Sequence, residues 1–296
     1  MNRLSRVIAA VVVGSLSVAA VFGQSEKINL RMAPAPDQTV RVTIAQDIDI
    51  DITLEGAPAL PGLAGPTRMV IRTTMTMTQK VGPRKPDGSV DAAMTYDQVK
   101  TDMSMNGQAL PAGNDAGQLT NLTVTATYNR NGELVDIKGF PVAGVLTADS
   151  FKQMMGSFYG NLPAQPIGVG ESVTTPVELA LPLPLPGGAP MKMVSTTNTK
   201  LVSLENSAAG RSARLEASTD GKMAGDMAAP DGKSRMQFDF VLSGGGTTVI
   251  DLARGVLRSS VTTINMNGTI GMGNGTPPGL PPMRMRATVT NTMASE

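Results

Sequence analysis

Apolar side chains alternate with polar ones over long stretches of this chain. The clearest stretch is Val40–Leu54, VRVTIAQDIDIDITL, in which the even positions hold Val, Ile or Leu and only Gln46 interrupts them. Most odd positions hold charged residues or threonine. A period of two over fifteen residues is typical of a long β-strand with one dry and one hydrated face. The pattern therefore predicts a strand over Val40–Leu54.

Comparable patterns predict that the protein is mainly β, with long antiparallel curved sheets, either continuous or arranged as two similar halves. Within Val90–Met105 the residues Met94 and Tyr96 keep the alternation, which then slips as a β-bulge allows. Asn131-Gly132 predicts a tight hairpin turn, and Gly244–Gly246 reads as another turn. Further strands are predicted at Met69–Lys80, Val90–Met105, Leu122–Tyr128, Glu133–Lys138, Val173–Leu181, Met191–Leu204, Arg211–Ser218, Ser234–Leu242, Thr247–Asp251, Val256–Ile270 and Met283–Thr292.

One segment has helical periodicity instead. Thr147 is a suitable N-cap, and Phe151, Met154, Met155 and Phe158 recur at the spacing of one helix face. The sequence therefore predicts an amphipathic helix near residues 147–159 that packs on the sheet. The Pro- and Gly-rich stretch 162–170 follows as a connector.

The first 23 residues have the composition of a secretory signal peptide. Arg3 and Arg6 precede the uncharged stretch Val7–Phe22, which is shorter than the roughly 20 residues of a membrane-spanning helix. Val21 and Gly23 supply small residues before Gln24, and cleavage after Ala20 is the alternative. The expected organisation is a signal peptide at 1–23, an N-terminal β-rich half with the helix at 24–161, and a C-terminal β-rich half at 162–296.

Composition narrows the chemistry that this protein can perform. It has no cysteine, histidine or tryptophan, so disulfides, thiolate catalysis and a histidine base are excluded, as is a lipid-anchoring cysteine. Without Arg3 and Arg6 the chain has 23 basic and 24 acidic residues, a balance that does not favour nucleic acid. We expect a periplasmic or secreted protein that is not an enzyme, without cofactor, with no catalytic, cofactor-binding or metal-binding residue assigned, and with no stable transmembrane segment after cleavage.

Two residue patterns have a metal-binding interpretation. Asp47, Asp49 and Asp51 share one strand face, but no glycine bends the chain around an ion, so a hydrated strand face is the preferred interpretation over calcium. The chain is also methionine-rich, with 20 methionines. The pairs Met75/Met77, Met103/Met105, Met191/Met193 and Met283/Met285 place two thioethers on one strand face, as copper(I) carriers do, although methionine also fills irregular apolar space.

Three segments resemble a family of exported bacterial proteins known only as a domain of unknown function. They are Thr95–Gly107 (TYDQVKTDMSMNG), Leu162–Ser172 (LPAQPIGVGES) and Val249–Gly255 (VIDLARG). The resemblance implies a β-rich, signal-bearing protein and assigns no catalytic residue. Many members of that family look like lipoproteins, and this cysteine-free chain departs from them there.

The best functional interpretation of the sequence is non-catalytic binding of an apolar small molecule or lipid-like partner in the cell envelope. A helix laid over a curved sheet would be similar in architecture to periplasmic lipoprotein and lipid carriers, and methionine-lined space is adaptable. A structural or protein-interaction module of the envelope or cell surface is the alternative, and copper(I) binding through the M-x-M pairs is the third.

The signal peptide gives a first testable prediction. N-terminal sequencing or mass spectrometry of the protein recovered outside the cytoplasm should find Gln24 as the first residue, because Val21 and Gly23 occupy the −3 and −1 positions of the exit. Recovery of the exported protein with Met1 intact would contradict it.

Overall fold

The computed structural model describes residues 26–31, 34–54, 66–110, 120–139, 162–163, 165–181, 191–207, 210–228, 235–272 and 283–296. Within these residues, almost all of the chain lies in one twelve-stranded antiparallel sheet, so the predicted β class is confirmed. A second sheet has two short strands, β1 (Lys27–Ile28) and β8 (Ile167–Gly168). The predicted helix near 147–159 and most of residues 140–161 lie outside the described residues.

The order of strands in the large sheet brings the first and the last long strand together. It is β7-β6-β4-β3-β2-β14-β13-β12-β11-β10-β9, with β5 added beside β4, so that the first long strand pairs with the last. Strands from both predicted halves thus share one sheet, and the boundary at residue 162 stays a prediction. The strands are β2 (Thr39–Leu54), β3 (Thr67–Val81), β4 (Val90–Met105), β5 (Gln108–Leu110), β6 (Thr123–Tyr128), β7 (Leu134–Lys138), β9 (Ser172–Leu181), β10 (Met191–Ser207), β11 (Gly210–Ala228), β12 (Arg235–Asp251), β13 (Val256–Met272) and β14 (Met283–Ser295).

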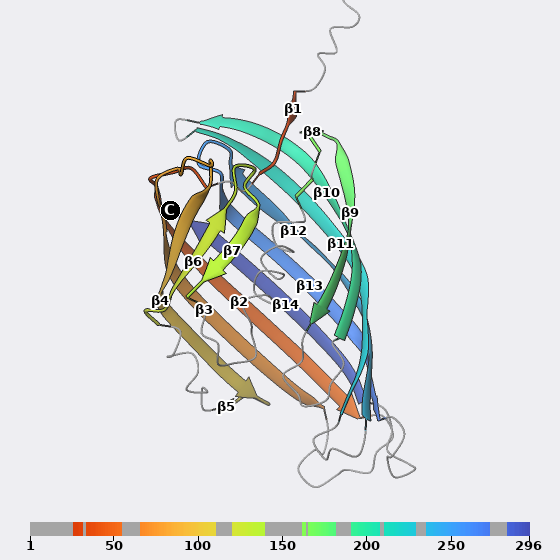
Figure 1. Ribbon diagram of the computed structural model, residues 1–296. Coiled ribbons are helices and arrows are strands. Elements are labelled where there is room, and N and C mark those ends of the chain that lie inside the picture. Colours follow the sequence, from red (N-terminus) through yellow and green to blue (C-terminus); the bar gives the residue numbers. More distant parts are fainter. Residues whose placement is uncertain are drawn as a thin grey trace, which may run out of the picture.

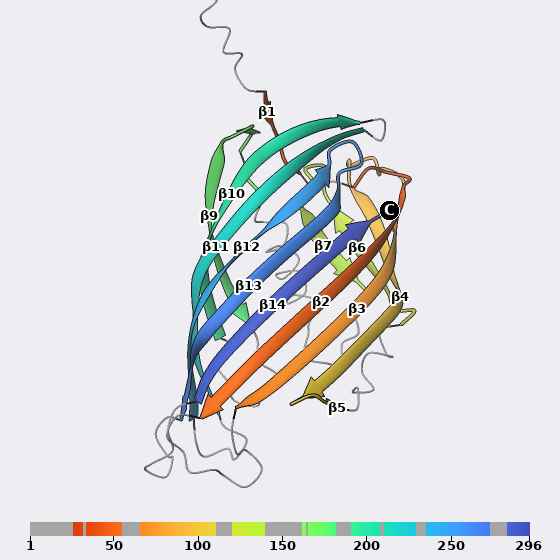
Figure 2. The same cartoon turned by 180° about the vertical axis from the view of Figure 1, so that it is seen from behind.

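The sheet is bent into a trough. Figure 1 looks into its concave side, with the edge strands β7 and β9 curling forward, and Figure 2 shows the convex side. The central strands are long: β2 has 16 residues, or about 50 Å at about 3.4 Å per residue. Pro176 lies in β9, an edge strand, where a missing backbone donor does not interrupt the sheet.

Strand pairing assigns each side chain to one of two faces. The inner face carries the even-numbered side chains of β2, such as Ile48 and Ile50, together with the side chains directly opposite them on successive strands. The short β1 strand packs on this face: Ile28 is buried against Leu201 and Ile250. In Figure 1 it lies in front of the sheet, so the inner face is the concave one.

Four β-bulges keep the alternation in phase with the two faces. In β4 the extra residue Asp97 allows both Tyr96 and Val99 to face inward, which leaves Lys100 and Asp102 on the outer face. Without it, the phase set by Tyr96 would turn both charges inward. The bulge that the sequence pattern predicted in this strand is therefore confirmed.

The other three bulges act in the same way. In β13 the extra residue is Arg258, which stays outside because Leu257 faces inward. In β10 an extra Val202 keeps Glu205 outside, and in β7 an extra Val135 keeps Asp136 outside. Each bulge thus prevents the burial of a charge, which is costly without a partner.

Among the described residues, three apolar clusters pack side chains from different strands together on the inner face. One joins β3, β4 and β6 around Tyr96 and Tyr128. A second joins β10, β11 and β12 to the β1–β8 sheet around Ile167 and Leu201. A third lies around Phe238 and Phe240, whose ring centroids are 6.2 Å apart. The connector predicted at 162–170 therefore does more than link two segments, because Ile167 pairs with the N-terminal strand and is fully buried.

The Gly244–Gly246 segment is not the turn that the sequence suggested. It lies in the middle of β12, so the two strands predicted at 234–242 and 247–251 are one. The reason is close approach between strands: a Cβ on Gly246 would collide with the Val261 carbonyl oxygen and lie 2.8 Å from the Thr262 Cα. Glycine permits this contact where the sheet bends. The Asn131-Gly132 hairpin is as predicted, with Gly132 at φ 81°.

This close approach predicts a stability difference between two strand glycines. Gly246→Ala should lower the free energy of unfolding by about 1–3 kcal/mol, because the new methyl group has no space. Gly271→Ala is the matched control: a Cβ there meets no atom within 4 Å, so unfolding should change by less than about 0.5 kcal/mol. Urea unfolding measures both, and equal effects would contradict the argument.

Candidate binding face

The inner face of the large sheet is almost free of charge. Among the side chains that the structure describes in this sheet, the only charged one on the inner face is Arg211, at the start of β11. Arg211 donates hydrogen bonds to Glu26, which neutralise it. Every other described Asp, Glu, Lys and Arg of the sheet lies on the outer face or at a bulge. The concave side is therefore built for uncharged contacts.

Two apolar rows cross the inner face from strand to strand. Directly paired residues place Met69, Ile50 and Ala287 side by side, and the next row places Ile71, Ile48 and Val289 side by side. The first row runs through Met105, Met69, Ile50, Ala287, Met266 and Leu242, and the second through Met103, Ile71, Ile48, Val289 and Ile264. Together the rows form an apolar surface about five strand spacings wide, or about 24 Å.

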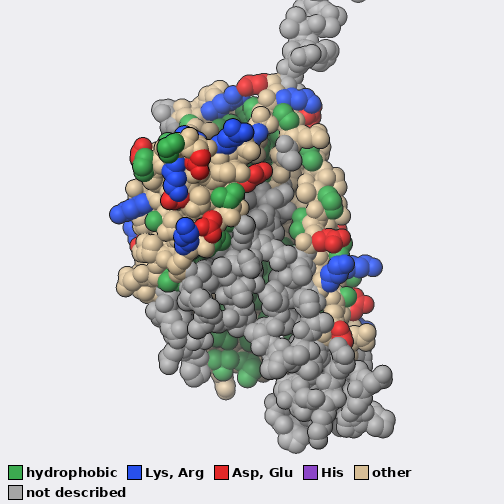
Figure 3. Space-filling model, viewed as in Figure 1, with side chains coloured by type: hydrophobic (Ala, Val, Ile, Leu, Met, Phe, Trp, Pro, Cys, Tyr) green, Lys and Arg blue, Asp and Glu red, His purple; other side chains and the backbone are tan. Residues whose placement is uncertain are grey.

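These apolar rows are partly buried: Ala287 and Leu242 keep only 3% and 5% of their surface exposed, whereas the other members are half-buried or exposed. Ile44, Ile48, Ile50 and Ile52 are all half-buried, whereas Val40 at the end of the same strand is fully buried. Met105 keeps 43% of its surface exposed at the β4 end of its row. Figure 3 shows hydrophobic side chains at the lower end of the concave side. The half-buried members of the rows thus leave apolar surface for an apolar ligand. Covering this surface contributes a free energy of about 25 cal/mol per Å² removed from water.

A polar row crosses the inner face next to these two apolar rows. Gln46 and Asn291 are cross-strand partners, and the Gln46 Nε2 donates to the Asn291 Oδ1 at 2.8 Å. The same row continues through Thr73 and Thr101, whose hydroxyl oxygens are 3.3 Å apart, and on the other side through Thr262. Gln46 is the residue that interrupts the apolar pattern of its strand, and Asn291 interrupts that of β14.

The described side chains of the methionine pairs lie on the inner face. Met75 packs against the cluster around Tyr96, and Met193 and Met285 pack against the cluster around Phe240. Met103 and Met105 lie on β4 at the ends of the two apolar rows. The pairs therefore come from separate strands, and their described members have apolar neighbours.

The three aspartates of β2 lie on the outer face. Asp47 and Asp49 pair with Arg72 and Arg68, and Asp51 lies directly opposite Arg68 and Arg286 on the flanking strands. Hydrogen bonds from Arg68 lower the pKa of Asp49. The predicted hydrated strand face is confirmed, and arginines lie opposite these carboxylates.

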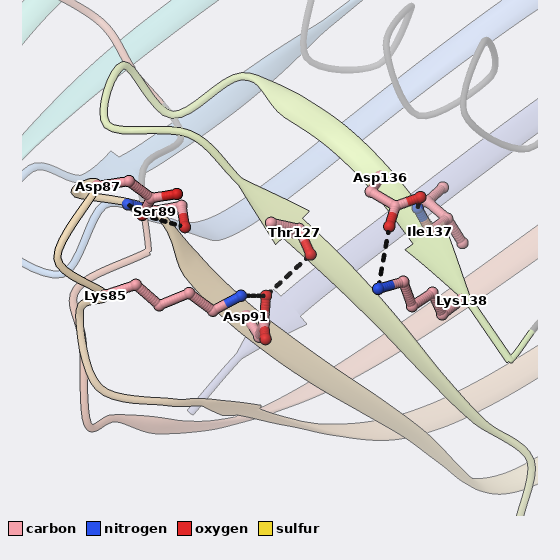
Figure 4. Close-up of polar contacts among 8 residues, drawn as sticks. All are labelled: Lys85, Asp87, Ser89, Asp91, Thr127, Asp136, Ile137 and Lys138. Carbon is pink, nitrogen blue, oxygen red and sulfur yellow. Dashed lines mark hydrogen bonds and ion pairs between the residues drawn. The ribbon is translucent and has the colours of Figure 1, made fainter.

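A polar pocket of about 410 Å³ lies where β4, β6 and β7 meet, away from the apolar rows. Four of its charged side chains, those of Lys85, Asp87, Asp136 and Lys138, already have partners, as Figure 4 shows. The Lys85 ammonium and the Thr127 hydroxyl both donate to Asp91, at 2.7 and 2.8 Å. Lys138 pairs with Asp136 at 3.4 Å. These contacts stabilise the ends of the strands and leave little charge for a ligand.

The described residues offer few groups for catalysis. Their buried polar side chains are Ser and Thr, and the described carboxylates are at least partly exposed. Within the same residues, no three His, Cys, Asp or Glu side chains gather at a potential metal site. Burial raises the pKa of the Tyr96 phenol, which lies inside an apolar cluster. No described helix has the length and hydropathy to cross a bilayer.

Comparisons with known proteins leave the function open. No family model and no curated protein matches the chain. A solved structure titled "Lipid-protein interactions in lipovitellin" aligns at 10% identity and TM-score 0.47, covering 88% of this chain and 25% of that one. DynF from the dynemicin biosynthesis pathway of Micromonospora chersina aligns at 8% identity and TM-score 0.19, covering 95% and 90%. This chain spans about a quarter of the lipovitellin chain, and neither likeness supports an argument about function.

The polar pocket gives a pH-dependent prediction. Hydrogen bonds from Lys85 and Thr127 lower the pKa of Asp91 from its ordinary value of 3.8, so the charged carboxylate favours the folded state. This stabilisation of the folded state is present above pH 3.8. It is lost as the pH falls through the pKa that Asp91 has in the folded protein, which is lower. Asp91→Asn should lower the midpoint of thermal unfolding by up to about 2 °C at pH 7, since the pair is exposed.

The control for this prediction is Asp239→Asn, on the exposed face of β12, where the aspartate has no ion pair or side-chain hydrogen bond with described residues. It should leave the midpoint unchanged. A difference between Asp91→Asn and wild type that grows below pH 3 would contradict the assignment.

Proposed function

We propose that this protein is an exported, non-catalytic binding protein for an apolar, lipid-like molecule, which it holds on the inner face of its sheet. The observation that carries the proposal is the uncharged, half-buried apolar surface around Ile48 and Ile50. Export and the absence of catalysis rest on the sequence, through the signal peptide and the missing histidine and cysteine. The resemblance to exported β-rich proteins agrees with export.

The dimensions of the apolar surface suit one or more hydrocarbon chains. From Ile48 to Ile52 the inner face extends about 14 Å along β2. A chain in one leaflet of a bilayer reaches about half of the 30 Å hydrocarbon thickness. The methionines of the rows add pliable side chains, which adapt to ligands of varied shape.

Charge explains why a lipid-like molecule is preferred over a peptide or a nucleic acid. A bound peptide or nucleic acid presents charged groups that need charged partners, and the described inner face supplies none beyond the neutralised Arg211. The outer face carries the arginines, lysines and carboxylates instead. An apolar ligand thus fits the inner face, whereas the outer face suits contact with water.

The proposal predicts that one charge on the inner face abolishes binding. In a titration with the neutral dye Nile red, Ile50→Asp should weaken binding at least about tenfold, because the carboxylate would be desolvated beside the ligand. The control is Val241→Asp, which makes a comparable substitution at an outer-face valine with 54% exposure and should leave binding unchanged.

Met105→Asp provides a second inner-face variant that folding should tolerate, since Met105 is 43% exposed. Native mass spectrometry of protein purified without detergent should also show bound lipid. The proposal is wrong if wild type binds no dye saturably and carries no lipid, or if the inner-face and outer-face variants behave alike.

A further inference from the structure

We infer that the ligand of the inner face is an uncharged amphiphile, whose hydrocarbon chain lies on the apolar rows and whose ester, amide or hydroxyl group binds Gln46 and Asn291. The inference rests on the proposed function and specifies the class of ligand. It is carried by the polar row that crosses the otherwise apolar concave face.

The polar row has hydrogen-bonding capacity that its own contacts leave unused. The bond from Gln46 to Asn291 employs one donor and one acceptor, so the Gln46 carbonyl oxygen and the Asn291 amide nitrogen have no partner among the described residues. Together they present an acceptor and a donor side by side. Both residues are half-buried, so leaving these groups dry under a hydrocarbon would be costly.

The row crosses the inner face beside the apolar surface. On one side are the rows of Ile48 and Ile50, which are half-buried. On the other side lie Ile44 and Met293, which are also half-buried, and beyond them the buried clusters that contain Tyr96 and Leu201. A chain placed on the Ile48 and Ile50 rows would therefore bring its polar end to Gln46 and Asn291.

The same face selects against an ionised headgroup. A carboxylate or phosphate at the polar row would meet amides and hydroxyls but no free cation, since the described cations of the central strands lie on the outer face. Burying an unpaired charge costs far more than burying a neutral group that forms hydrogen bonds. The ligand's polar group is therefore neutral.

The test compares three ligands of equal chain length by displacement of Nile red at about pH 8: 1-monolauroylglycerol, which is neutral and polar; laurate, which is ionised; and dodecane, which is apolar. Wild type should bind monolauroylglycerol about tenfold more tightly than dodecane, and laurate most weakly. In Gln46→Leu/Asn291→Leu, the preference for monolauroylglycerol over dodecane should be lost.

The matched control is Thr263→Val/Thr290→Val, which removes a hydrogen-bonded pair at 3.2 Å from the outer face of neighbouring strands and should keep the wild-type ranking. Equal binding of all three ligands by wild type, or tightest binding of laurate, overturns the inference even if the double leucine variant fails to fold. Preference for monolauroylglycerol that survives in a folded double leucine variant also overturns it. Failure of every ligand to displace bound dye also overturns the inference, whereas absence of both dye binding and bound lipid refutes the proposed function itself.

Discussion

The segregation of charge to one face of the sheet is the constraint on which the rest of this structure depends. A strand residue that slips by one position moves to the opposite face, and a buried charge without a partner is costly. In a sheet with strands of 15 residues and more, a single slip would turn several charges inward. The four bulges prevent this: each adds one residue where the alternation would otherwise bring Lys100, Asp136, Glu205 or Arg258 to the inner face.

Curvature turns the uncharged face into a possible binding surface. A flat sheet would expose its apolar side to water or to a second sheet, whereas this sheet bends so that its edges approach the same side. Glycines in the middle of β12 allow neighbouring backbones to come close, as the contact between Gly246 and Val261 shows. The buried clusters then occupy parts of the trough, and the half-buried rows around Ile48 and Ile50 remain between them.

Polar groups have different roles on the two faces. On the outer face, pairs such as Asp47 with Arg72 are exposed and contribute little to stability, but they keep the surface soluble. On the inner face the polar groups are neutral and few, and Gln46 binds Asn291 across two strands that meet from opposite ends of the chain. A neutral pair in this position can be desolvated by a ligand that offers matching groups, which a charged pair would resist.

The sequence by itself determined the local structure, because alternation, turn residues and bulges are encoded within a few neighbouring residues. Val40–Leu54 and Asn131-Gly132 could be assigned in this way, and so could the slip after Tyr96. Gly244–Gly246 was misread as a turn, since its role depends on the neighbouring strand, which local pattern does not identify. Only the tertiary structure showed that Gln46 and Asn291, which each interrupt an apolar phase, are partners. These two residues are 245 positions apart in the sequence and meet because the first long strand pairs with the last. Such pairing depends on the whole sheet rather than on any local sequence.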